Sequence, residues 1–105
     1  VTITSSTDLM HMQEKRIEQK LVKAVKAHGG VAIKMNPAGM NGIPDRLVLM
    51  PGGKALFIEV KAPGRKPRAL QITRMKQLEA LGFPCFVLDD DKQIEEVIKN
   101  GIQTT

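Results

Sequence analysis

Hydrophobic and polar positions form several repeating patterns along the chain, and the first long one has the period of an α-helix. Over about residues 13–28, Ile17, Leu21 and Val25 recur every four residues while lysines and arginines fill the other faces. This spacing is typical of an amphipathic helix. The sequence HGG ends the pattern, because glycine adopts the left-handed conformation at a helix C-terminus at little cost. The pattern therefore predicts a first helix over about 13–28.

Shorter apolar runs predict the rest of the fold. Between the expected elements lie the loop NPAGMNGIP and the basic loop APGRKPR, whose Asn, Gly and Pro residues favour irregular backbone. The order αβββαβα, without repeats or linkers, predicts an α/β fold with a mixed central sheet flanked by helices. The elements expected after the first helix are the strand VAIKM, two strands flanking PGG, a helix over about 69–81, the strand PCFVL and a helix over about 92–100.

The hairpin around PGG decides which side chains share a face. Alternation along the third strand puts Glu59 and Lys61 on the same face. A three-residue loop pairs Asp45 with Glu59, whereas a two-residue loop would place Asp45 opposite Val60. We expect the three-residue loop, as a type I turn followed by a left-handed Gly53, because proline is favoured at the first central position of that turn.

Asp45, Glu59 and Lys61 then converge at the end of an apolar hairpin. Mg²⁺ prefers hard oxygen ligands and keeps several waters, so two carboxylates suit it, and a bound ion offsets their mutual repulsion. Lys61 is then placed to orient or activate a water, or to stabilise charge on a phosphate. The structural alternative makes Asp45 a turn residue after Pro44, and Glu59 with Lys61 an exposed ion pair worth at most about 1 kcal/mol.

The charge distribution indicates an anionic partner. The chain carries a formal net charge of +5, and no acidic residue occurs from 62 to 78, directly after the hairpin. Such a basic segment can also be a solvated face, but its position favours binding of a phosphate backbone. Because the chain has three Phe and no Trp or Tyr, base stacking is a poor route to recognition. The residues expected to bind nucleic acid are Arg65, Lys66, Arg68 and Arg74.

Length and the N-terminal residues set the domain organisation. A chain of 105 residues supports one core. The stretch VTITSSTDLM lacks the basic and apolar regions of a secretory signal. We expect residues 1–11 to be a leader, disordered or foreign to the natural protein, and 12–105 to be the single domain. The lone Cys85 and the lack of a membrane-length apolar run predict a soluble protein of the cytoplasm.

The motif GIPD followed by FIEVK, after a helix that carries Glu, resembles the PD-(D/E)xK nuclease signature and, more narrowly, the VRR-NUC domain. The resemblance extends over residues 14–89. It implies a restriction-endonuclease-like αβββαβ core and metal-dependent phosphodiester hydrolysis with Mg²⁺ or Mn²⁺. It also implies that Asp45 and Glu59 bind the metal with the backbone carbonyl of Val60, and that Lys61 is the catalytic lysine.

Two further positions come from the same resemblance. The family usually has an acidic residue on the first helix facing the site, and Glu14 and Glu18 lie on one helix face. The spacing of Glu18 from Gly29 is similar to that in archaeal Holliday junction resolvases, so we expect Glu18 to be catalytic and a metal ligand, with Glu14 as the alternative. The alternative for both glutamates is that they belong to an ordinary solvated helix face, paired with neighbouring lysines. Gln71, in RALQ, matches a glutamine that often reaches the active site.

The sequence thus predicts a small metal-dependent endonuclease that acts on duplex or branched DNA. A catalytic domain without a second DNA-binding module favours a homodimer, and the resemblance to junction resolvases points the same way. Free-standing VRR-NUC domains also occur in bacteriophages, which would place the protein in the host cytoplasm. The alternatives are a non-catalytic nucleic-acid-binding module with a nuclease fold and an RNA-directed nuclease.

Overall fold

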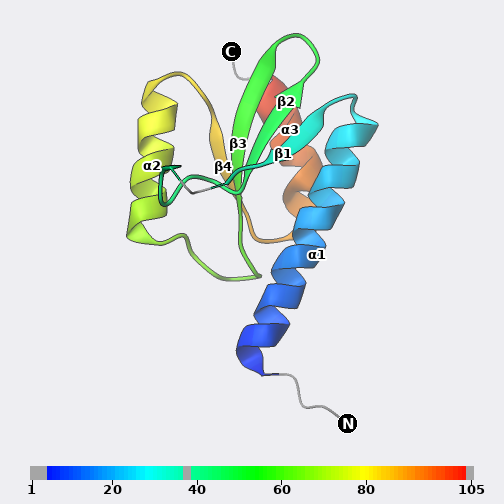
Figure 1. Ribbon diagram of the computed structural model, residues 1–105. Coiled ribbons are helices and arrows are strands. Elements are labelled where there is room, and N and C mark those ends of the chain that lie inside the picture. The colour runs from blue at the N-terminus through cyan, green and yellow to red at the C-terminus, as the bar shows by residue number, and fades with distance from the viewer. Residues whose placement is uncertain (1–4, 37–38, 104–105) are drawn as a thin grey trace.

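The computed structural model describes residues 5–36 and 39–103 and has the predicted order αβββαβα (Figure 1). Within these residues, no helix combines the length and apolar character needed to cross a lipid bilayer. The elements are α1 (Ser6–Ala27), β1 (Val31–Lys34), β2 (Arg46–Met50), β3 (Lys54–Val60), α2 (Ala69–Ala80), β4 (Cys85–Leu88), the 3₁₀ turn η2 (Asp91–Gln93) and α3 (Ile94–Gln103).

The strands form a mixed sheet in the order β1-β2-β3-β4. The first three strands are antiparallel, and β4 runs parallel to β3 because α2 makes the crossover between them. In the hairpin, Arg46 lies opposite Ile58 and Met50 opposite Lys54. This register leaves a three-residue loop and, one position further, brings Asp45 beside Glu59. The predicted register is confirmed.

The hairpin turn itself differs from the predicted type. Gly53 has a φ of +75°, as expected, but Gly52 also has a positive φ of +85°. A type I turn requires a negative φ at its second central residue, whereas a type II turn requires a positive one and therefore favours glycine there. The prediction of a type I turn is wrong, although the loop length that sets the register is correct.

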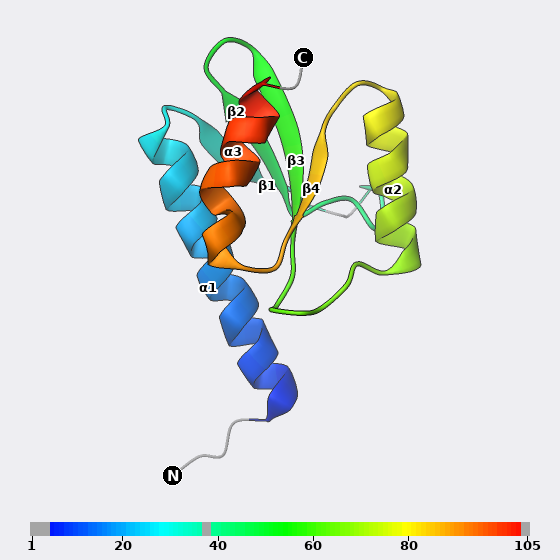
Figure 2. The ribbon, with the colours of Figure 1, turned by 180° about the vertical axis from the view of Figure 1, so that it is seen from behind.

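Helices cover the two faces of the sheet unequally. Figure 2 shows α3 in front of the sheet with α1 beside it. These two helices bury Ile17, Leu21 and Val97 against Leu56 and Ile58 of β3, and together they enclose the main core. The helix α2 lies beside β3 and β4 on the other face, where its Gln71 and Met75 are buried. The apolar core therefore lies on the α1–α3 side, and α2 leaves much of the other face open.

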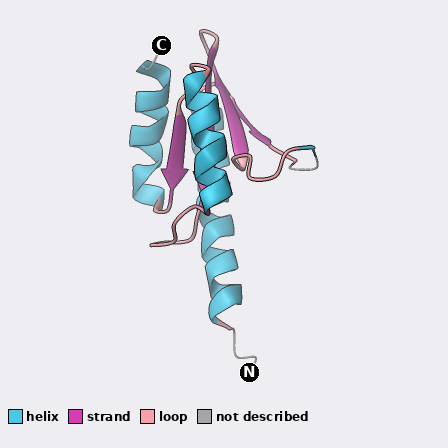
Figure 3. Ribbon diagram, turned by 90° about the vertical axis from the view of Figure 1, so that its left-hand side faces the viewer, coloured by secondary structure: helices cyan, strands magenta, loops and turns pink. Residues whose placement is uncertain are grey.

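The helix α1 begins earlier than the sequence predicts. It starts at Ser6, and the side-chain oxygen of Ser5 accepts a hydrogen bond from the N–H of Asp8 at 3.1 Å. An N-cap serine and an acid in the first turn both stabilise a helix start. Residues 6–11 are helical, so the expectation of disorder is wrong for them, while a leader foreign to the natural protein and a domain over 12–105 stay predictions; residues 1–4 lie outside the described residues. Figure 3 shows this end of α1 projecting beyond the sheet.

Candidate active site

Asp45 lies immediately before β2, and both its backbone carbonyl and its carboxylate accept hydrogen bonds from backbone N–H groups. Its carbonyl oxygen accepts the N–H of Met35 at 2.8 Å. Its Oδ2 accepts the N–H of Val60 at 2.8 Å, so the carboxylate is fixed at the end of β3. Burial raises the pKa of Asp45, and the hydrogen bond from Val60 counteracts that rise. The buried Pro44 directly precedes it and restrains the entry of the chain.

The loop that leads to Asp45 rests on α2. Gly42 has a φ of +80°, and a Cβ at this position would lie only 2.7 Å from Cγ of Leu70. Arg74 Nε donates a hydrogen bond to the carbonyl of Asn41 at 2.8 Å. Its Nη1 donates to Oε1 of Gln77, one turn along α2, at 3.1 Å. Arg74, expected to bind nucleic acid, is thus already bonded within the protein. That role stays a prediction, and the contacts favour loop anchoring.

Glu59 is the most deeply buried acid near Asp45, with 2% of the residue exposed. Its Oε2 accepts a hydrogen bond from Gln71 Nε2 at 2.7 Å and lies 3.2 Å from Lys61 Nζ. Its Oε1 is buried and has no hydrogen-bond partner among the described residues. Burial, reinforced by the charge of Asp45 and opposed by Lys61, raises the pKa of Glu59 to about 7. Such a carboxylate is costly unless a cation or a further donor completes its contacts.

Gln71 connects this carboxylate to the start of α2. Its Oε1 accepts the N–H of Arg68 at 2.7 Å, while its Nε2 donates to Glu59. The side chain therefore caps the helix and holds one oxygen of Glu59 in place. The structure brings Gln71 to Glu59, where the sequence analysis expected it, and a catalytic role for its amide stays a prediction.

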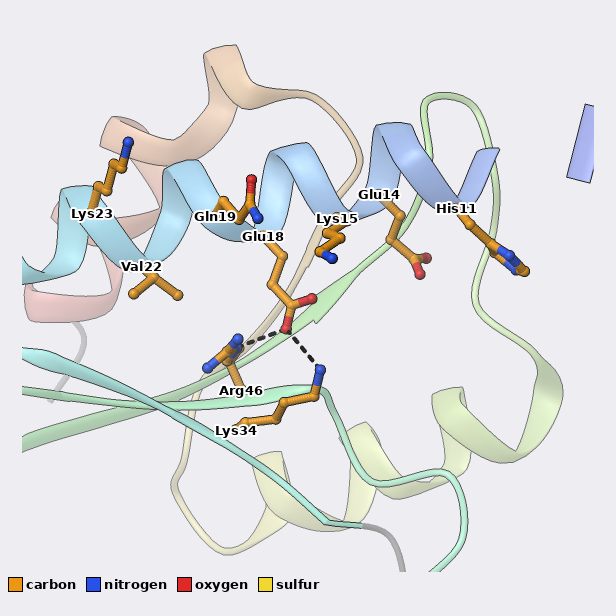
Figure 4. Close-up of a pocket in the computed structure, with 9 residues that line it drawn as sticks. All are labelled: His11, Glu14, Lys15, Glu18, Gln19, Val22, Lys23, Lys34 and Arg46. Carbon is orange, nitrogen blue, oxygen red and sulfur yellow. Dashed lines mark hydrogen bonds and ion pairs between the residues drawn. The ribbon is translucent and has the colours of Figure 1, made fainter. Parts of the chain in front are cut away.

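Glu18 on α1 is tied to the strands by basic side chains (Figure 4). Its Oε2 accepts a hydrogen bond from Arg46 Nε at 2.8 Å and lies 3.8 Å from Lys34 Nζ. Arg46 also donates to the carbonyl of Ala32 at 3.2 Å. Glu18 thus joins α1 to β1 and β2. Its expected role as a metal ligand stays untested, and these contacts favour a structural one.

Glu14 lies one turn earlier on α1, and both helix acids interact electrostatically with Asp45, since the charge of Glu18 raises the pKa of Asp45. Its pKa is raised by burial and by the charge of Asp45, and lowered by Lys61. Figure 4 shows its carboxylate directed away from the Arg46 and Lys34 pair that holds Glu18. Because Glu18 is paired with Arg46 and Lys34 while Glu14 interacts with Lys61, these contacts favour Glu14, and which of the two acids serves the site stays a prediction.

Arg46 is a residue that the sequence analysis missed. It directly follows Asp45, and its side chain lies on the α1 side of the sheet together with Val48 and Met50, as alternation along β2 requires. A charged residue in an otherwise apolar strand face signals a buried partner. That signal was present in RLVLM, but the partner on α1 depends on how the helix is rotated against the sheet.

A small cleft of about 360 Å³ adjoins Lys61 and contains most of the predicted basic residues. An excess of positive charge beside two acids that can hold a metal is suited to phosphate groups that flank a reacting bond. Three of the four residues predicted to bind nucleic acid therefore gather next to the candidate lysine. The cleft is lined by Thr7, Met10, His11, Glu14, Lys61, Ala62, Arg65, Lys66 and Arg68.

The donor atoms fit a hard divalent cation. Asp45 and Glu59 supply carboxylate oxygens, and the buried Oε1 of Glu59 has no other partner in residues 5–36 and 39–103. Over those same ranges, no cluster of three or more His, Cys, Asp or Glu residues is arranged to hold a metal. Two carboxylates are ligands of the kind that Mg²⁺ or Mn²⁺ accepts, because these ions bind through one or two carboxylates and retain several waters.

Comparison with known proteins finds a similar phage protein and a similar solved structure. No protein-family model matches the chain. A protein named "Putative nuclease p44", from Acyrthosiphon pisum secondary endosymbiont phage 1, is 46% identical over 78 residues, which are 74% of this chain and 84% of the relative. A solved structure described as a VRR_NUC domain superposes with a TM-score of 0.77 at 30% identity, over 83% of this chain and 95% of that one. Both similarities span most of the chain.

Proposed function

The chain belongs to the VRR-NUC family of nuclease domains, and we propose that it is a metal-dependent endonuclease that hydrolyses DNA phosphodiester bonds with Mg²⁺ or Mn²⁺. The observation that carries this proposal is Glu59. It is buried and shares the end of one hairpin with Asp45 and Lys61. Its Oε1 has no hydrogen-bond partner in the part of the chain that the structure describes.

Each residue of the site has a defined task in this proposal. Asp45 and Glu59 would hold the cation together with the carbonyl of Val60, and Gln71 keeps the Glu59 carboxylate oriented through its 2.7 Å hydrogen bond. A divalent cation bound there would polarise the phosphate and lower the pKa of an attacking water. As that water adds to phosphorus and an ester bond breaks, Lys61 Nζ stabilises the negative charge on the phosphate oxygens.

The surrounding residues position the substrate. Arg65, Lys66 and Arg68 line the cleft beside Lys61 and bind the phosphates that flank the scissile bond. Glu14 contributes a water-mediated contact to the cation, since its carboxyl interacts with both Asp45 and Lys61. None of these contacts reads a base, so recognition is directed to the backbone or to the shape of the DNA.

We further propose that two copies act together on two strands of duplex or branched DNA, in the cytoplasm of a phage-infected host. Val31, Ile33 and Leu49 are exposed apolar side chains on the face of β1 and β2 opposite α1 and α3. An exposed apolar patch of this kind supports contact with a second copy. Sedimentation of the purified protein with and without a four-way junction tests the dimer directly.

The test of the nuclease proposal is a cleavage assay on supercoiled plasmid, a labelled four-way junction and an RNA duplex of matched sequence. Each substrate is incubated in Mg²⁺, in Mn²⁺ and in EDTA with the wild type, Asp45→Asn and Lys61→Ala. The exposed Glu96→Gln on α3 serves as the control. We expect metal-dependent DNA cleavage that both site variants lose and the control keeps.

Other outcomes separate the alternatives. DNA binding of equal strength in EDTA and in Mg²⁺, without cleavage in either metal, would establish a non-catalytic binding module. Preferential cleavage of the RNA duplex would make the protein an RNA-directed nuclease. Equal cleavage of plasmid and junction would remove the preference for branched DNA while leaving the catalytic site intact.

A further inference from the structure

A second, larger groove lies along α1, on the opposite side of Glu14 from the cleft next to Lys61. It has a volume of about 840 Å³ and is bounded by α1 on one side and by β1 and β2 on the other (Figure 4). We call it the helix groove. One row of α1 residues forms its rim at every fourth position, and a second row faces the strands. The helix groove is lined by His11, Lys15, Gln19 and Lys23 of the rim, by Glu14, Glu18 and Val22 of the inner row, and by Lys34 and Arg46.

The helix groove carries an excess of positive charge. Four of its lining residues are lysine or arginine and two are glutamate. The Glu18 carboxylate is already offset by Arg46 at 2.8 Å and Lys34 at 3.8 Å. Lys34 still exposes 71% of its side chain, and Lys15 and Lys23 are exposed on the helix rim. These lysines can therefore meet an anion without breaking the pair that joins α1 to the sheet.

The spacing of the rim lysines suits a nucleic-acid backbone. Lys15 and Lys23 are eight residues apart, which corresponds to about 12 Å along an α-helix. One strand of a DNA duplex advances about 3.4 Å per nucleotide, so this part of the rim spans roughly three to four nucleotides. The groove is lined by one apolar side chain, Val22, among charged and polar ones, which is a poor match for an apolar ligand.

The helix groove and the Lys61 cleft meet at the candidate active site. His11 and Glu14 line both of them, and Glu14 interacts electrostatically with Asp45 and Lys61. The cleft continues to one side through Arg65, Lys66 and Arg68, and the helix groove continues to the other. The two basic tracts therefore adjoin at Glu14, beside Lys61 of the candidate site.

From this arrangement we propose that the helix groove binds the sugar-phosphate backbone beyond the scissile phosphate, so that the substrate strand continues on both sides of the bond that is cut. This inference rests on the proposed nuclease function and extends it. It makes Lys15, Lys23 and Lys34 substrate-binding residues.

The test compares two variants of equal charge. Lys15→Ala/Lys23→Ala/Lys34→Ala alters the helix groove, and Lys26→Ala/Lys92→Ala/Lys99→Ala removes three exposed lysines elsewhere. Binding of a DNA duplex is measured across a salt series in EDTA. Each lost phosphate contact reduces the slope of log affinity against log salt by about 0.9. We expect the groove variant to lose about 2 to 3 units of slope and the control to match the wild type.

A second variant and a second substrate keep the test decisive. Lys15→Ala/Lys23→Ala leaves the contact between Lys34 and Glu18 intact, so its loss of slope would not come from a loosened α1. A covalently closed DNA circle, which has no strand end, is then incubated with the wild type in Mg²⁺. The proposed endonuclease nicks this circle, and the inference predicts that Lys15→Ala/Lys23→Ala nicks it at least about 10-fold more slowly at moderate salt.

The outcomes distinguish this inference from the nuclease proposal. Equal salt slopes for the groove variant and the wild type, with the circle still nicked in Mg²⁺, would overturn the helix groove as a backbone tract while leaving the nuclease in place. A wild type that leaves the closed circle intact in Mg²⁺ would instead overturn the proposed endonuclease itself.

Discussion

Glu18 and Glu59 are two carboxylates with little exposed surface, and the fold treats them differently. The Glu18 side chain is 16% exposed and accepts a hydrogen bond from Arg46 at 2.8 Å. The Glu59 side chain is 2% exposed and has Lys61 at 3.2 Å, and its second oxygen lacks a hydrogen-bond partner within the described residues. Glu18 is paired with two basic side chains, whereas Glu59 is paired with Lys61 through one oxygen only and keeps a second, buried oxygen to which a bound metal ion could coordinate.

The difference shows that the contacts of an acid with little exposed surface indicate whether its role is structural or functional. A paired acid such as Glu18 contributes to the attachment of α1, because removing its partner would leave a charge without compensation. An acid such as Glu59, with a pKa raised to about 7 by burial and by Asp45, opposes folding at neutral pH. Groups that violate local rules in this way concentrate at functional sites.

The largest expected effect is on the rate of DNA cleavage, which should depend strongly on Glu59 and weakly on Glu18. Glu59→Gln keeps the shape of the side chain and removes its charge, so cleavage in Mg²⁺ should fall on the order of 10³-fold or more. Glu18→Gln should stay within about 10-fold of the wild type, since its carboxylate is bonded to Arg46. The measurement is single-turnover cleavage of a labelled duplex. A larger loss in Glu18→Gln than in Glu59→Gln would reverse the assignment.

The next effect concerns the lysine beside Glu59. Lys61→Ala should lower kcat about 10²- to 10³-fold with little change in KM, because the ammonium acts on charge that develops during the reaction. Lys61→Arg keeps the charge but presents a planar group of different shape, and recovery should be partial. Steady-state kinetics on the same duplex check this. A change in KM alone would make Lys61 a simple binding residue.

A third effect is on the free energy of unfolding and involves Glu18. Arg46→Ala leaves Glu18 without its closest partner and should reduce the free energy of unfolding by about 2 to 4 kcal/mol. Adding Glu18→Gln to Arg46→Ala should recover part of that loss, because the uncompensated charge is then removed. Urea denaturation of the single and double variants provides the measurement. Additive losses would mean that the pair is not coupled.

The smallest effect is a pH dependence of stability. The pKa of Glu59 is about 7 in the folded protein, against 4.5 for the unperturbed group, so between these values the folded state binds the extra proton. Stability should therefore fall as the pH rises through this window, by up to about 1.4 kcal/mol per pH unit. The free energy of unfolding in EDTA from pH 5 to 8 should show this slope in the wild type and a smaller one in Glu59→Gln, where only the raised pKa values of Asp45 and Glu14 remain. An unchanged slope in the variant would assign the proton to another group.

The sequence predicted the hairpin well because its determinants are local. Alternation placed Glu59 and Lys61 on one face, and the loop Pro51-Gly52-Gly53 set the register that brings Asp45 beside Glu59. The approach of Gln71 to Glu59 followed from family resemblance. The turn type was wrong because Gly52 takes the positive φ that glycine permits.

The contacts of α1 were not predictable in the same way. Whether Glu14 or Glu18 faces the site depends on the rotation of the helix against the sheet, and the two residues lie on one helix face. The pair between Glu18 and Arg46 joins residues 28 positions apart, and no local pattern specifies such a contact. The early start of α1 at Ser6 depends on the Ser5 cap, a signal present in SSTD that the polar character of the segment concealed.

The measurement that tests the central claim most directly is Mn²⁺ binding without DNA, by titration calorimetry and by the loss of the free-ion electron paramagnetic resonance signal. It is applied to the wild type, Glu59→Gln and Glu18→Gln, each checked for folding by circular dichroism. Mn²⁺ should bind the wild type and Glu18→Gln with similar affinity and Glu59→Gln at least about 10-fold more weakly. Equal binding by Glu59→Gln and the wild type, or loss of binding in Glu18→Gln alone, would contradict the assignment of Glu59 as the metal-binding acid.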